Sequence, residues 1–195
     1  MVKHTVREET RGVLVFVGVV WCVFVVGLVL PFSVNSLGVK PRSLIGLVGV
    51  PLMPFLHADW KHLLSNTVPL TVLLLLLAGS KAKSWAIVIC IVLMGGALLW
   101  LFGRSANQAT HIGASGLIYG LIAFLLVAGF LERRIVSLVI SILVGFLYGG
   151  TLLSGIVPDL GSHISWEGHL FGAVAGGLVA GMLTKRSEQT EAKSA

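Results

Sequence analysis

The chain has 195 residues, of which 56% are hydrophobic and 11% charged. A soluble domain carries about 25% charged residues, so a soluble globular fold is excluded, and disorder is excluded because disordered segments are poor in apolar residues. The net charge of +6 comes from basic residues between apolar runs, without the interleaved aromatic residues of a base-stacking surface. We expect an integral membrane protein in a lipid bilayer, with no nucleic-acid partner. Cys22 and Cys90 fall inside apolar runs and are expected to be small buried residues rather than a disulfide.

Six apolar stretches without Asp, Glu, Lys or Arg follow one another along the chain. Each is long enough to cross a bilayer as a helix, and their continuous apolar character argues against the alternating pattern of a barrel. The first is too long for the apolar core of a signal peptide and is expected to remain as a span. The sequence predicts an all-α membrane protein, a six-transmembrane-helix bundle over 12–184 with polar tails at 1–11 and 185–195. The expected spans are 12–32, 62–80, 84–103, 113–131, 135–156 and 168–184.

The distribution of Lys and Arg predicts the orientation of this bundle. With the N-terminus inside, the inner segments 1–11, 81–83, 132–134 and 185–195 hold ten of these residues. The outer segments hold four: Lys40, Arg42, Lys61 and Arg104. By the positive-inside rule, both termini should be cytoplasmic.

The longest connection, 33–61, lies between the first two spans on the expected outer side. Its apolar stretch SLIGLVGVPLMPFLHADW is interrupted by Pro51 and Pro54, which predicts a segment lying in the interface rather than a seventh span. Three tryptophans fall near the outer boundary and fit an aromatic belt; they are Trp60, Trp100 and Trp166.

Polar residues gather where three spans begin. The second span starts with His62-Leu-Leu-Ser-Asn66, the fourth contains Ser115, and the sixth contains His169. Counting from the inner charges at 1.5 Å per residue places Ser115, His169 and Asn66 roughly 22–27 Å above them, slightly below the outer surface of a layer about 30 Å thick. Polar groups at this depth are costly, so each is a candidate functional residue.

Together these residues supply what acyl-transfer chemistry needs. A serine hydroxyl needs a base within hydrogen-bonding reach, and Ser115 and His169 can form that pair. The oxyanion of the tetrahedral intermediate needs donors, which the His62 imidazole and the Asn66 amide can supply. Glu167 is two residues from His169 and faces another side of the helix, so we predict a Ser–His dyad rather than a triad.

Glycines support this arrangement. Gly113 and Gly116 flank the serine, and Gly168, Gly172 and Gly176 recur every fourth residue. Small residues at this spacing let helix backbones approach closely, as a serine and a histidine on different helices require. Glycine is also common in membrane helices generally, so an alternative interpretation is that the repeat reflects this composition and has no link to the site.

The motifs HADWKHLLSN, HIGASGLIYG and SWEGHLFGAVAGG resemble those of the rhomboid family of intramembrane serine proteases in its basic six-helix form. The resemblance covers roughly residues 12–184. It implies a serine endopeptidase that cleaves transmembrane substrates, here single-span membrane proteins, near their outer ends, with no metal and no cofactor. It also implies that Ser115 is the nucleophile and His169 its base. The fifth span, with Gly145 and its neighbours, would admit substrate laterally.

The resemblance assigns roles to further residues. His62, Asn66 and the Ser115 backbone N–H would form the oxyanion site. Tyr119 would pack against the His169 ring, and His57 would be a structural hydrogen-bonding residue in the outer loop.

Two other functions stay open from the sequence. One is a catalytically silent relative that binds membrane clients, which the filled dyad positions disfavour. The other is a transporter or metal site, which the absence of acidic residues in the spans and of an HExxH motif disfavours. Its candidate ligands would be His57, His62, His111, His163 and His169. The spans and the positive-inside bias predict a bacterial cytoplasmic (inner) membrane, with an organellar membrane as the alternative.

Overall fold

The computed structural model describes residues 6–81, 84–104, 110–132, 134–158 and 165–194, the last with side chains up to 184. All regular elements in these ranges are helical. The long helices are α1 (Val6–Val29), α3 (Trp60–Ser80), α4 (Ser84–Phe102), α5 (Ser115–Leu131), α6 (Ile135–Gly155) and α7 (Trp166–Ser194). In the described part of the chain, α1, α3, α4 and α6 are long and apolar enough to cross a membrane, and α5 is a shorter apolar helix. These helices indicate an integral membrane protein.

The second to fifth predicted stretches agree with α3, α4, α5 and α6 to within two residues at each end. The outer two differ. Helix α1 begins at Val6 rather than 12 and ends at Val29, shortly before Pro31, since the residue preceding a proline disfavours helical geometry. Helix α7 continues to Ser194 through the predicted polar tail 185–195. Lys, Arg, Glu, Gln and Ala in this tail are good helix formers, so polarity does not end the helix.

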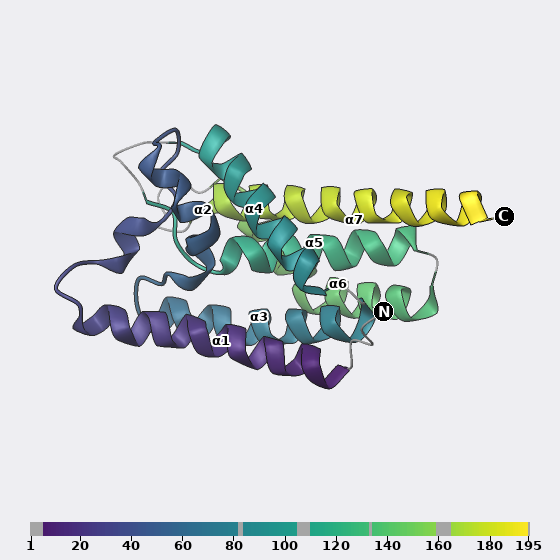
Figure 1. The fold of residues 1–195 in the computed structure, drawn as a ribbon, viewed down its shortest axis with the longest axis horizontal. Coiled ribbons are helices and arrows are strands. Elements are labelled where there is room, and N and C mark those ends of the chain that lie inside the picture. The colour runs from purple at the N-terminus through teal and green to yellow at the C-terminus, as the bar shows by residue number, and fades with distance from the viewer. Residues whose placement is uncertain (1–5, 82–83, 105–109, 133, 159–164, 195) are drawn as a thin grey trace.

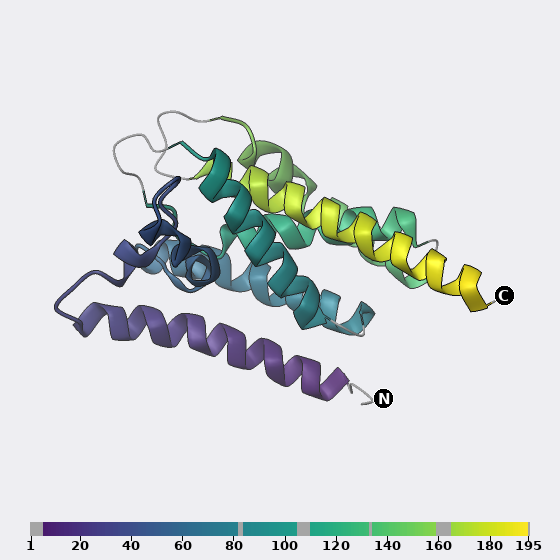
Figure 2. The same cartoon turned by 45° about the horizontal axis from the view of Figure 1, so that its top comes forward.

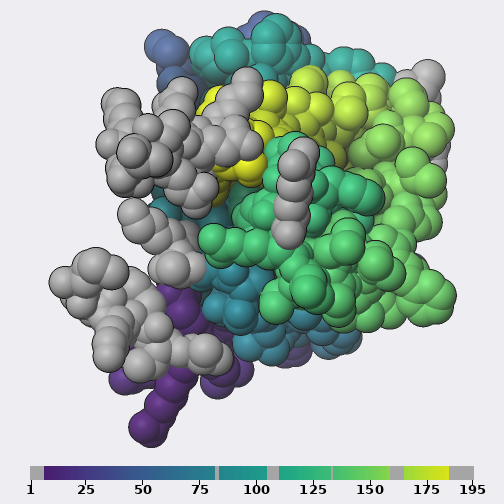
Figure 3. Space-filling model, turned by 90° about the vertical axis from the view of Figure 1, so that its right-hand side faces the viewer, coloured from purple at the N-terminus to yellow at the C-terminus, as the bar shows by residue number. Residues whose placement is uncertain are grey.

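Helix α5 occupies the centre of the bundle and contacts α3, α4, α6 and α7. Helices α1 and α3 run side by side below it, and α4 crosses α7 obliquely (Figures 1 and 2). Seen from one end, α5 lies between α6 and α3, with α7 above it (Figure 3). The side chains of α5 that form this centre are almost all apolar and buried, which fits a helix surrounded by protein rather than lipid.

The connection after α1 forms short helical turns instead of a long helix, as the two prolines predict. These are η1 (Val34–Leu37), η2 (Ile45–Leu47), α2 (Gly49–Leu52) and η3 (Met53–Phe55). They gather at the end of the bundle opposite the start of α1 and the end of α7 (Figure 1). Val39 N donates to His111 O at 2.9 Å and His111 N donates to Val39 O at 2.8 Å. The outer segment is thereby attached to the strip of chain that precedes α5.

The expectation that both cysteines are buried is wrong. Cys22 on α1 and Cys90 on α4 are free and exposed. The outward face of a membrane helix is as apolar as its buried face because lipid surrounds it, so an apolar neighbourhood in the sequence does not distinguish the two. The absence of a disulfide between them agrees with the prediction.

Polar side chains tie the helices together at the opposite end. Lys81, which follows α3, forms an ion pair with Glu132 at the end of α5, and Ser137 Oγ on α6 donates to the same carboxylate at 2.7 Å. Burial by itself raises the pKa of Glu132, but the hydrogen bonds from Lys81 and Ser137 outweigh burial and lower it below its ordinary value. Three helices therefore share one charged anchor.

Candidate active site

Ser115 is the first residue of α5, and the chain before it is fixed by main-chain contacts. Gly113 has φ +113°, a conformation that side chains rarely adopt, and its N–H donates to Met53 O at 3.0 Å. The left-handed turn at Gly113 lets the chain enter α5 at Ser115. The Ser115 side chain is half-buried, so its hydroxyl group is held at the edge of the bundle.

His169 lies in the first turn of α7 and stacks on Tyr119 of α5. The ring centroids are 4.0 Å apart and the ring planes differ by 3°. Tyr119 follows Ser115 by four residues and shares its helix face. The residue on which His169 stacks thus lies one helical turn after Ser115 on α5.

Glycines bring α5 and α7 into backbone contact. A Cβ atom added to Gly116 would lie 3.2 Å from Gly168 O, and one added to Gly120 would lie 3.0 Å from Gly172 O. In the other direction, a Cβ on Gly172 would overlap Gly116 O and one on Gly176 would overlap Gly120 O. The close approach predicted from the glycine spacing is present, and it sets the distance between the helices that carry Ser115 and His169.

His62 and Asn66 reach the same place from α3. Asp59 caps this helix by accepting from the His62 N–H at 2.8 Å. A Cβ on Gly113 would lie 2.6 Å from His62 Nε2 and 3.7 Å from Asn66 Nδ2. The imidazole and the amide thus converge on the backbone two residues before Ser115, where only glycine leaves room.

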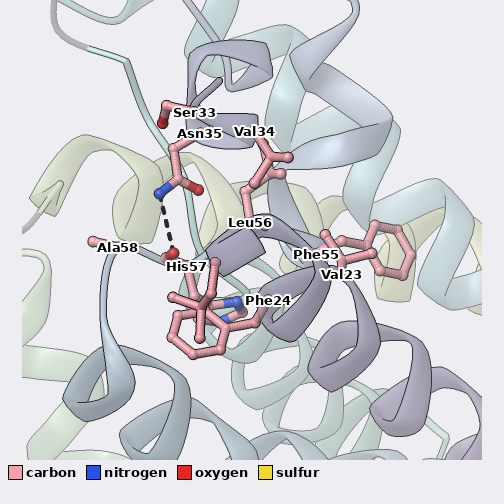
Figure 4. Close-up of a pocket in the computed structure, with 11 residues that line it drawn as sticks. Val23, Phe24, Ser33, Val34, Asn35, Phe55, Leu56, His57 and Ala58 are labelled. Carbon is pink, nitrogen blue, oxygen red and sulfur yellow. Dashed lines mark hydrogen bonds between the residues drawn. The ribbon is translucent and has the colours of Figure 1, made fainter. Parts of the chain in front are cut away.

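His57 supports the amide of Asn66. Asn66 Nδ2 lies 3.1 Å from His57 Nε2, and because the amide nitrogen donates, this ring nitrogen accepts. His57 also borders a cavity of about 140 Å³ between the end of α1 and the outer segment. Figure 4 shows Asn35 above His57, and Val23 with Phe55 to the right of them; Asn35 Nδ2 donates to His57 O at 3.1 Å.

The environment of His57 keeps its ring neutral. Burial disfavours the imidazolium, nearby His62 adds repulsion, and together they lower the pKa of His57 to about 4.

The low pKa of His57 predicts a pH-dependent stability. The unfolded chain binds this proton near pH 6.5, so the free energy of unfolding should fall as the pH drops from about 6.5 to about 4, by about 3 kcal/mol in total. The His57→Gln variant keeps a polar group at this position but has no imidazole to protonate, so it should not show this acid-induced loss of stability. Unfolding curves of both proteins at pH 7 and pH 4.5 test this; parallel losses would contradict it.

Ser165 and His111 help to position α7, although in the sequence His111 stood out only as a candidate metal ligand and Ser165 had no predicted role. Ser165 Oγ accepts from Gly168 N at 3.1 Å and so caps α7, and it lies 2.7 Å from His111 Nδ1. The spacing Ser-x-x-Gly before an apolar run could have indicated this cap. Glu167 accepts from Arg104 Nε at 2.8 Å, away from His169, in agreement with its predicted helix face.

The histidines do not assemble as metal ligands where the structure describes them. No group of three His, Cys, Asp or Glu side chains among the described residues has a geometry that could hold a metal ion. His163, one of the five candidate ligands, lies outside the described residues. The described histidines contact asparagine, tyrosine, serine and backbone groups, and the rings of His57 and His62 also meet edge to face.

Comparison with known proteins identifies the family. The Rhomboid domain matches residues 44–186, so this chain belongs to the rhomboid family, whose members are in general intramembrane serine proteases. Uncharacterized proteins of Mycobacterium bovis and Mycobacterium tuberculosis are each 42% identical in an alignment 187 residues long that covers 92% of this chain and 77% of theirs. An uncharacterized protein of Mycobacterium leprae is 38% identical over 92% of this chain and 73% of its own. No solved structure gives a significant match.

Proposed function

We propose that this protein is an intramembrane serine endopeptidase that hydrolyses peptide bonds of single-span membrane proteins near the outer membrane face. Ser115 attacks the scissile carbonyl carbon, and His169 accepts its proton and later donates it to the leaving amine. His62, Asn66 and the Ser115 N–H stabilise the oxyanion. The reaction needs water but neither metal nor cofactor.

The stack of Tyr119 on His169 is the observation that carries this proposal. Tyr119 lies one helical turn after Ser115 on the same face of α5, and its ring stacks on the His169 imidazole with centroids 4.0 Å apart. Convergence of His62 and Asn66 at Gly113 adds hydrogen-bond donors next to the same serine.

The proposal includes a topology. Six spans over 12–184 place both tails on the cytoplasmic side, in keeping with the ten inner Lys and Arg residues. The start of α1 and the end of α7 lie at one end of the bundle, and α5, whose first residue is Ser115, begins toward the other (Figure 1). The mycobacterial relatives favour a bacterial cytoplasmic membrane.

Cleavage by purified protein tests the proposal. The wild type in liposomes should cut a single-span substrate carrying a fluorescent reporter, and a fluorophosphonate should label Ser115, as located by mass spectrometry. Ser115→Ala should do neither, whereas Ser36→Ala, an exposed serine of the outer segment, should match the wild type. A wild type that neither cleaves nor is labelled would favour the client-binding function.

The oxyanion role of Asn66 gives a separate prediction. Asn66→Ala should lower kcat by about 10²- to 10³-fold because one donor to the developing charge is lost. Asn35→Ala is the matched control, since Asn35 also donates to His57 but belongs to the outer segment; its kcat should stay within about threefold of the wild type. Steady-state kinetics of the three proteins decide. Equal rates for Asn66→Ala and Asn35→Ala would exclude Asn66 from the oxyanion site.

A further inference from the structure

A Ser–His dyad lacks the carboxylate that orients the histidine in a triad, and the structure provides another acceptor at that position. His169 Nδ1 lies 3.0 Å from Gly155 O, the carbonyl of the last residue of α6. Resting on the proposed function, we infer that the Gly155 carbonyl is the positioning group for His169 and acts as a backbone counterpart of the third triad residue.

The hydrogen bond settles which ring nitrogen carries the proton. A carbonyl oxygen can only accept, so His169 must carry a proton on Nδ1. In the neutral ring, Nε2 then has a free lone pair, which is the form that can take a proton from the Ser115 hydroxyl. With the opposite tautomer the base would face the serine with an N–H and could not act.

The position of Gly155 at a helix end makes its carbonyl a suitable partner. The last four carbonyls of a helix have no partner within the helix, so Gly155 O is available without breaking a backbone bond. The C-terminal end of a helix also carries roughly half a negative charge. This charge favours the imidazolium that forms when His169 accepts the proton, as a carboxylate would.

The same turn of α6 also holds the ring stacked on His169. Tyr119 OH donates to Thr151 O at 2.9 Å, one turn before Gly155. A Cβ on Gly155 would overlap the Tyr119 ring, so only glycine lets this carbonyl reach His169 beside Tyr119. Two carbonyls of α6 therefore fix two stacked rings that belong to α5 and α7.

A backbone substitution tests this inference without changing any side chain. Replacing Ile156 by its α-hydroxy acid converts the 155–156 peptide bond into an ester, whose carbonyl is a weaker acceptor. The full-length protein with this ester should show a fall of about tenfold in kcat with KM within about twofold. Fluorophosphonate labelling of Ser115 should slow by the same factor. The matched control replaces Val157 by its α-hydroxy acid, which converts the next peptide bond, 156–157, into an ester. In this control, kcat and the rate of labelling should stay within about twofold of the wild type.

A spectroscopic measurement keeps the test independent of activity. In long-range ¹H–¹⁵N spectra of histidine-labelled protein above pH 8, the signal missing from His169→Ala should show the Nδ1–H tautomer. An Nε2–H tautomer, or equal rates for the two esters, would overturn the inference. Failure of the proposed function has a different signature, because the wild type would then neither cleave nor be labelled while the tautomer of His169 stayed as assigned.

Discussion

Replacing His169 by alanine is expected to lower kcat/KM for a transmembrane substrate by at least about 10⁴-fold. The Ser115 hydroxyl would then have no base, because no other described imidazole stacks on Tyr119, the residue one helical turn after Ser115. Because nucleophile and base act as one unit, the double variant with Ser115→Ala should be no slower than either single variant. Rates with a fluorescent single-span substrate in liposomes measure this loss.

Folding of the His169→Ala variant must be established alongside its rate. Loss of the ring removes a contact with Tyr119 and the bond to Gly155, so some destabilisation is expected. A thermal unfolding midpoint well above the assay temperature, with wild-type helix content, would assign the loss of rate to chemistry. If the folded variant keeps more than a tenth of the wild-type rate, His169 is not the base.

Gly172→Ala is expected to have the largest effect on stability. The added methyl group would overlap the Gly116 carbonyl oxygen, a backbone atom that cannot turn away as a flexible side chain can. We expect the free energy of unfolding to fall by about 3 kcal/mol or more, which is the upper end of the range for substitutions that overpack a protein interior. Gly176→Ala should behave alike, because its methyl group would overlap Gly120 O.

Gly181→Ala is the matched control on the same helix. A Cβ at this position meets nothing within 4 Å, and alanine has a higher helix propensity than glycine. Its unfolding midpoint should therefore equal or exceed that of the wild type. Unfolding of all four proteins in mixed micelles provides the comparison. A Gly172→Ala protein as stable as Gly181→Ala would mean that α5 and α7 are further apart than described.

Local patterns predicted much of the fold because each membrane helix must satisfy its own backbone hydrogen bonds. The run 135–156 and helix α6 (Ile135–Gly155) differ by one residue. Helix ends are predicted less well from polarity where a helix continues beyond the lipid boundary. Polar residues at 185–195 predicted a tail, yet the helix continues to Ser194. Exposure of Cys22 was missed for a related reason, since lipid-facing and protein-facing positions carry the same residue types.

The candidate site was predictable only in its polar members. Ser115, His169 and Asn66 stood out because polar groups are costly at membrane depth, and the structure brings α3, α5 and α7 together around them. Gly155 could not be found in this way. Its contribution is a carbonyl, which every residue has, and its partner on α7 is 14 positions away. Only the packing of α6 against the stacked rings selects it.

Main-chain groups alone make the bridge between Val39 and His111, so the attachment does not depend on which side chains these segments carry. Substitutions at exposed positions of the outer segment should therefore leave its attachment to the residues before α5 in place. Three glycines of this segment are exceptions. A side chain at Gly46 or Gly49 would collide with the backbone of Lys40 or Gly38, and one at Gly38 would collide with the His111 carbonyl. Variation of this surface is therefore open at its exposed positions, and it is restricted at these glycines and at residues such as His57 that contact the candidate site.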